Sequence, residues 1–138
     1  MTKTVRFGVS LDRDLLKTFD RVIRGRHYTN RSEAIRDLIR DNLVQKEWED
    51  NKEVAGAVML LYNHNQRELV SRLMNIQHQY HHAIISTQHI HLDHTCCLEI
   101  VVLKTTAAGA HELFNALKSQ RGVKHAGFTV TSTGAELA

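Results

Sequence analysis

The first fifty residues contain one strand-like segment and two helix-like segments, and this combination strongly limits how they can fold. Residues 4–10 alternate apolar and polar side chains, which is typical of a half-buried strand. Two amphipathic segments follow. One starts after Asp12, which can cap a helix, and ends near Gly25; the other starts at Asn30 and reaches about Trp48. Because a lone strand cannot make a sheet, a second copy of the chain is the economical source of a partner strand.

Two such chains would form an antiparallel ribbon clasped by four helices. This arrangement resembles the ribbon-helix-helix class of transcription regulators, in which the ribbon enters the major groove of DNA. The outward side chains of Arg6 and Ser10 would then face base edges. Asn30, Arg31 and Ser32, with the free N–H groups at that helix N-terminus, would suit a phosphate. The alternative is a structural dimerisation module with a solvated basic face.

Charge and composition support a DNA partner for the N-terminal part. Residues 1–40 hold ten Lys and Arg against five Asp and Glu, although the net charge of the 138 residues is only +3. No apolar run approaches membrane-spanning length, and the N-terminus lacks the apolar core of a signal peptide. We therefore expect a cytoplasmic protein with no membrane partner. Adjacent Cys96 and Cys97 are expected as reduced thiols, because a disulfide between neighbours is strained.

A charged segment over residues 45–52 predicts a domain boundary, with one domain over 1–48 and a second over 53–138. Patterns in the second part predict a strand at 54–62, a helix, a hairpin, another helix and a strand at 123–131. The order β-α-β-β-α-β is the ferredoxin-like arrangement, of which the ACT-type regulatory domain is one version. The predicted fold class is α+β.

The predicted hairpin holds an unusual concentration of metal-ligating side chains. Residues 78–97 carry six of the ten histidines and both cysteines. Residues 83–92 predict a strand on which His89 and His91, two positions apart, share one face. After a polar turn, a returning strand that opens at Cys97 would bring a thiol beside the two imidazoles.

Two imidazoles and one thiol on one sheet face predict a transition-metal site. These donors suit zinc, copper or nickel, whereas calcium and magnesium prefer oxygen. Three ligands leave one position for water or for a fourth side chain, and His78, eleven residues before His89, could supply it. Neighbours on a strand point to opposite faces, so only one of Cys96 and Cys97 can join the histidines.

The two halves together resemble the nickel-responsive transcriptional regulators. The resemblance covers nearly the whole chain, and its most specific residues are 30–37, 77–78, 89–91 and 97–104. It implies a square-planar Ni(II) ion bound by His89, His91 and Cys97 of one subunit and by His78 of a neighbour. It also implies a homotetramer, a dimer of dimers, that binds double-stranded operator DNA and represses genes of nickel uptake.

The resemblance suggests further roles outside the ligand set. Glu99 would support the metal site by orienting its ligands. Glu33 and Asp37 would meet a cation where the two domains touch on DNA, and Arg67 would reach a phosphate. One departure is Gly8, which stands at an outward ribbon position where the family commonly presents a polar base-reading side chain.

Other functions compete with this interpretation. A regulator that responds to another transition metal, such as copper or zinc, is the nearest alternative. A zinc enzyme is less favoured because no Asp or Glu is obviously placed as a general base, so we expect no enzymatic activity. An ACT-type amino-acid sensor would make the histidines incidental. A ribbon-helix-helix antitoxin would normally carry a short tail rather than a second folded domain.

Overall fold

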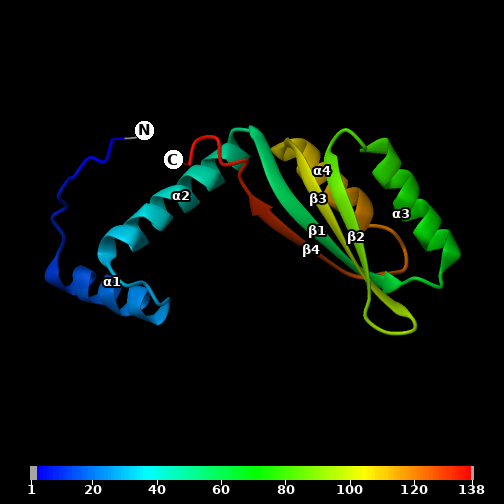
Figure 1. Ribbon diagram of the computed structural model, residues 1–138, viewed down its shortest axis with the longest axis horizontal. Helices are drawn as coiled ribbons and strands as arrows, with labels where there is room; N and C mark the ends of the chain where they lie inside the picture. Colours follow the sequence, from blue (N-terminus) through cyan, green and yellow to red (C-terminus); the bar gives the residue numbers. More distant parts are fainter. Residues whose placement is uncertain (1–2, 138) are drawn as a thin grey trace. The chain divides into compact units, whose positions relative to one another are not determined.

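The computed structural model describes residues 3–137 and divides the chain into two compact units. One unit runs up to Leu43 and the other spans Val44–Ala135. No helix in the described part of the chain is long and apolar enough to cross a membrane. The helices and strands are α1 (Arg13–Gly25), α2 (Arg31–Glu49), β1 (Glu53–Asn63), α3 (Arg67–Gln79), β2 (Ile84–His91), β3 (Cys96–Thr106), α4 (Ala107–Lys118) and β4 (Val123–Thr131) (Figure 1).

Residues 3–12, which precede α1, form no strand within the single chain. Val5, Phe7 and Val9, the alternating apolar side chains, are 79%, 71% and 61% exposed. A lone strand has no neighbour for its backbone N–H and C=O groups, so this segment is left unpaired. Pairing with a second copy therefore stays a prediction.

Helices α1 and α2 begin where the sequence predicted, but their caps differ. Asn30 caps α2 through its side chain, since its Oδ1 accepts the Glu33 N–H at 2.9 Å. Asp12 stands at the N-cap position of α1, yet its side chain makes no capping hydrogen bond, contrary to the predicted cap. Instead, its backbone carbonyl accepts the N–H of Leu16 at 3.0 Å.

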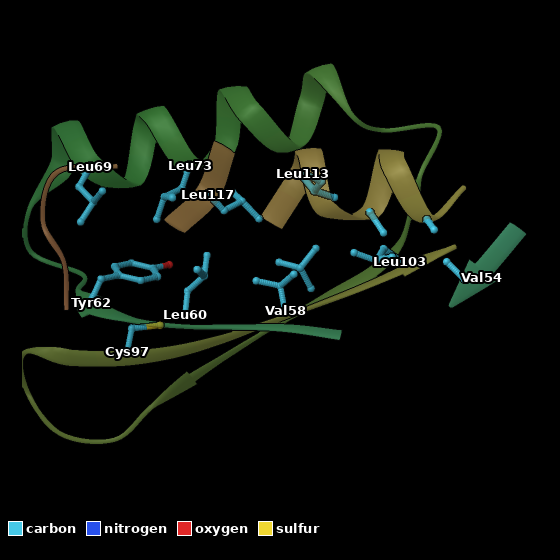
Figure 2. Close-up of a cluster of buried hydrophobic side chains, with 13 residues drawn as sticks. Val54, Val58, Leu60, Tyr62, Leu69, Leu73, Cys97, Leu103, Leu113 and Leu117 are labelled. Carbon is cyan, nitrogen blue, oxygen red and sulfur yellow. The ribbon is translucent and has the colours of Figure 1, made fainter. Parts of the chain in front are cut away.

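The second unit is a four-stranded antiparallel sheet in the order β2-β3-β1-β4. With α3 after β1 and α4 after β3, this topology confirms the predicted ferredoxin-like fold. Both helices cover the same face of the sheet (Figure 2). The strand predicted at 123–131 has the bounds of β4, and the other strands predicted for this unit differ from the observed ones by a few residues at their ends.

The core lies between this sheet face and the two helices. Alternate residues of β1 and β3 are buried, as the period of a strand requires. The fully buried side chains include Val58, Leu60, Leu69, Leu73, Val101, Leu103, Leu113 and Leu117 (Figure 2). The opposite sheet face is only partly covered, with Met59 43% exposed.

The end of α2 packs against this unit. The Trp48 indole N–H donates to the Thr131 carbonyl at 2.9 Å, and the ring lies edge-on to Phe128 with centroids 5.6 Å apart. These contacts place the last turns of α2 with the sheet. The division into units accordingly falls between Leu43 and Val44, inside α2, whereas the charge pattern predicted a boundary a few residues later.

Candidate metal centre and DNA-binding surface

The hairpin of β2 and β3 gathers the predicted donor residues on one sheet face. In the antiparallel ladder His91 lies directly opposite Cys97, and His89 lies directly opposite Glu99. Directly opposed residues project to the same side of a sheet. Cys97 and Glu99 are each 1% exposed beneath the helices, so the two histidines point to the helix-covered face as well.

The register also places the two cysteines on opposite faces of the sheet. Cys97 shares the face of the histidines, and its neighbour in the ladder on the other side is Tyr62 of β1. Cys96 precedes it on the strand and therefore projects to the opposite face, where it is half-buried. The ladder thus places Cys97 on the same sheet face as His89 and His91, directly opposite His91.

A buried carboxylate anchors this face. Glu99 accepts a short hydrogen bond from the Tyr62 hydroxyl, and its other oxygen, Oε1, accepts one from the Gln77 side-chain N–H at 2.5 Å. His89 Nε2 lies 3.7 Å from that same Oε1. The Thr87 hydroxyl of β2 donates in turn to the side-chain oxygen Oε1 of Gln77 at 3.0 Å. Glu99 therefore ties the end of α3 to the strand that carries His89.

Burial raises the pKa of Tyr62 far above its usual range, and the hydrogen bond to Glu99 raises it further. Both causes favour the neutral phenol, because an ionised oxygen would lose solvation and lie beside a carboxylate. Tyr62 therefore stays a hydrogen-bond donor to Glu99 at all ordinary pH values.

His78 and His89 of one chain line the same pocket, of about 330 Å³. Its other lining residues are Met74, Gln77, His81, Ile84, Thr87 and Glu99. Within residues 3–137, however, no three His, Cys, Asp or Glu side chains form a group that could hold a metal ion. A single chain therefore aligns the donors on one face without closing a metal centre.

Sequence reasoning missed two partners of this face, Tyr62 and Gln77. Tyr62 was treated only as the end of an apolar strand, and Gln77 only as part of the family motif. The register of the sheet could have revealed Tyr62, because a tyrosine at the end of β1 lies opposite Cys97 of β3. This pairing of β1 with β3 is known only from the structure. A third residue, His64, stacks against His91 with ring centroids 4.5 Å apart.

The predicted DNA-contacting residues are all exposed, but Arg31 already has a partner. Its guanidinium makes two hydrogen bonds of 2.8 Å to the Asp20 carboxylate on α1. The hydrogen bond from Arg31 lowers the pKa of Asp20 from its ordinary value. Arg6 and Ser10 lie in the unpaired segment, and Ser32 lies on the first turn of α2.

The more weakly implied residues are engaged as well. Glu33 pairs with Arg36, and the Asp37 carboxylate pairs with Arg40 at 3.1 Å. Both acids of the implied cation site therefore have arginine partners within the chain. Arg67 opens α3 and lines a pocket of about 720 Å³, whose wall also includes two further arginines.

The two units match two family models, which together define a class, the DNA-binding regulators that couple a ribbon-helix-helix domain to a metal-binding domain. Residues 5–46 match the family described as "Ribbon-helix-helix protein, copG family", and residues 55–131 match the "NikR C terminal nickel binding domain". The two matches together cover most of the chain.

Relatives named as nickel-responsive regulators match along the full length. One from Syntrophus aciditrophicus is 54% identical over 134 residues, which cover 97% of this chain and 98% of the relative. Another from Solibacter usitatus is 50% identical and covers 99% of each chain. The chain belongs to the family of nickel-responsive regulators, and it is accordingly a transcription regulator and not an enzyme.

A solved structure gives independent support for the fold alone. The uncharacterized protein TM1266 from Thermotoga maritima superimposes with a TM-score of 0.53 at 12% sequence identity. The match covers 59% of this chain and 100% of that one.

Proposed function

We propose that this protein represses genes of nickel uptake, binding operator DNA when Ni(II) is held by His89, His91 and Cys97 of one subunit and His78 of another. The observation that carries the proposal is the register of the hairpin, which puts His91 opposite Cys97 with His89 two residues away on the same face. The assembly we propose is a homotetramer, a dimer of dimers, in the cytoplasm.

The donor chemistry fits nickel. A thiolate with imidazoles suits the later first-row transition metals, and a flat array of four such donors suits Ni(II). Glu99 lies beside His89, where a carboxylate can orient the imidazole through its hydrogen-bonding nitrogen. When bound, the ion would join two subunits through these four side chains, which accords with a single chain that aligns donors without closing a centre.

Hydrogen bonds to Glu99 could couple metal binding at the hairpin to the end of α3, where His78 lies. Gln77 precedes His78 at the end of α3 and donates to Glu99, while Glu99 lies opposite His89 on β3. The two proposed ligand segments therefore share one buried acceptor. An effector changes DNA affinity only through its differential affinity for the competent state. We infer that fixing His78 favours the assembly whose two ribbons reach two half-sites.

On the DNA side, the exposed apolar side chains of residues 5–9 would be buried by pairing with a second copy, leaving Arg6 and Ser10 outward. Arg31 would have to exchange the Asp20 carboxylate for a DNA phosphate. Such an exchange replaces one charge-assisted pair by another, so it costs little.

Copper(II) is the second candidate effector, because the same donors accept it and it binds most N and S sites at least as tightly. An absorption spectrum of the nickel-loaded protein separates the geometries. A yellow, diamagnetic form is expected for square-planar nickel. An octahedral spectrum at one ion per subunit would contradict the proposed ligand set.

The test of function is a DNA-binding titration at fixed salt, with and without Ni(II). His89→Ala should abolish the effect of nickel while leaving the metal-free affinity unchanged. Arg6→Ala should reduce discrimination between operator and random DNA by about 5- to 150-fold, the equivalent of 1–3 kcal/mol, with or without metal. His94→Ala, in the exposed turn of the same hairpin, is the matched control and should behave as wild type. Equal DNA affinity with and without nickel in the wild type would refute the proposal.

A further inference from the structure

The imidazole of His64 lies face to face with that of His91, and the metal-binding role proposed above does not use it. The two ring centroids are 4.5 Å apart and the ring planes are parallel, at an interplanar angle of 0°. His64 Nε2 is buried and has no hydrogen-bond partner. His64 therefore contacts His91 through the flat face of its ring and not through a ring nitrogen.

The backbone of His64 is held firmly at the end of β1. Its N–H donates to the carbonyl of Thr95 in the hairpin turn at 3.0 Å. The Asn63 side chain accepts the N–H of Asn65 at 2.9 Å, which shapes the turn around His64. Asn63 itself is the last β1 residue paired with β3. His64 is thus anchored to the same hairpin that carries His91.

Within residues 3–137, the stack with His64 is the one side-chain contact seen for His91. This histidine is the last residue of β2, an edge strand, and its side chain is exposed. An exposed side chain samples several rotamers, and a ligand that must be ordered on binding weakens affinity. Its neighbour His89, by contrast, lies beside the Glu99 carboxylate. Stacking on His64 would therefore limit the rotamers that the His91 ring can adopt.

The stacked geometry excludes a shared metal ion for these two rings. An imidazole nitrogen binds a metal with the lone pair that lies in the plane of its ring. Two parallel, stacked rings have no common plane, so one ion cannot lie in both. In this arrangement His64 is therefore not a second ligand beside His91.

From these contacts we propose that His64 is a positioning residue, whose ring stacks on His91 and holds that imidazole ready for nickel. This inference rests on the proposed function, because His91 is a proposed ligand there. The role belongs to the flat face of an aromatic ring. Phenylalanine at position 64 should fulfil it, whereas alanine should not.

The experiment compares His64→Ala and His64→Phe with wild type. Nickel affinity is measured by competition with a chelator, and His91 ring-proton resonances are recorded in the metal-free protein by NMR. Supporting partners of metal ligands typically contribute 10- to 100-fold in affinity, so His64→Ala should weaken nickel binding by about that factor. His64→Phe should stay within about threefold of wild type. The His91 protons should be shifted upfield by the stacked ring in wild type and His64→Phe and lose this shift in His64→Ala.

Other results would contradict either the positioning role of His64 or the proposed metal site. Equal weakening by both substitutions would show that the His64 nitrogen is used, and would overturn the positioning role. Nickel affinity and His91 resonances that are unchanged in His64→Ala would overturn it as well. If His89→Ala bound nickel as tightly as wild type, the proposed metal site itself would be refuted. This result is readily told apart from the other two.

Discussion

The two units of this chain differ in how much of their apolar surface one copy can bury. In the unit Val44–Ala135, side chains such as Leu60, Val101 and Leu113 are completely buried. In the described residues up to Leu43, only Ile23 and Ala34 are buried, while Phe7 and its apolar neighbours are exposed. One chain therefore completes the core of the second unit, whereas the first unit keeps exposed apolar side chains that the proposed pairing with a second copy would bury.

The largest expected effect on stability distinguishes a buried apolar residue of the second unit from an exposed one of the first. Leu113→Ala removes a fully buried side chain and should lower the free energy of unfolding of the second unit by about 2–5 kcal/mol. Phe7→Ala should leave that unit unchanged. Urea unfolding followed by tryptophan fluorescence checks this, because the single tryptophan, Trp48, packs against β4.

Far-UV circular dichroism supplies the complementary measurement for Phe7→Ala. A transition that belongs to paired N-terminal segments should depend on protein concentration, and Phe7→Ala should lower its midpoint. If Phe7→Ala moved the fluorescence transition as far as Leu113→Ala does, the distinction between the two units would be wrong.

An intermediate effect is expected from two tyrosines, Tyr28 of the first unit and Tyr62 of the second. The pKa of Tyr62 is raised by burial and by its hydrogen bond to Glu99, and that of Tyr28 is raised by its hydrogen bond to Asp37. The unfolded chain releases the tyrosine proton near pH 10 while native Tyr62 retains it. Stability due to Tyr62 is therefore complete below pH 10 and is lost as the pH rises above it.

Tyr62→Phe tests this sign. At neutral pH the substitution should cost about 1–2 kcal/mol, because Glu99 loses one donor. Above pH 10, the decline of stability with pH should be less steep than in wild type, by up to about 1.4 kcal/mol per pH unit for one proton. Tyr28→Phe, in the less buried unit, should change the slope less. Unfolding by urea between pH 7 and 11 measures both, and equal slopes for wild type and Tyr62→Phe would contradict the assignment.

The smallest effect concerns the exposed pair of Asp20 and Arg31. Asp20→Asn should hardly change stability, because exposed ion pairs contribute little. It should raise DNA affinity at low salt by freeing the Arg31 guanidinium, and the gain should fade as salt increases. Asp14→Asn makes the same charge change on the same helix and is the control. Identical affinities for the two variants would mean that Arg31 does not contact a phosphate.

Strands could be predicted from the sequence where one of their faces packs against helices of the same chain. Residues 54–62, for example, were recognised as a strand from their apolar character. The register could be anticipated at the hairpin, where the short turn before Cys97 limits the pairing. Such local signals depend only on neighbours in sequence.

Contacts between distant segments were not predictable in the same way. Arg31 is eleven residues from Asp20, and the turn between their helices includes His27 with a positive φ of 63°. The stack of His64 on His91 and the bond from Gln77 to Glu99 both require the full sheet order. Side chains that support the site were missed because their partners are brought together only by tertiary structure.

The unpaired segment before α1 also bears on how the protein is made. Residues 3–12 leave the ribosome before the sheet domain does, and in the proposed assembly they would find their partner strand only when another copy is nearby. Until such pairing occurs, the exposed side chains of Val5, Phe7 and Val9 would be open to chaperones and to unwanted association. Chains translated from one messenger, close together, would find partners soonest.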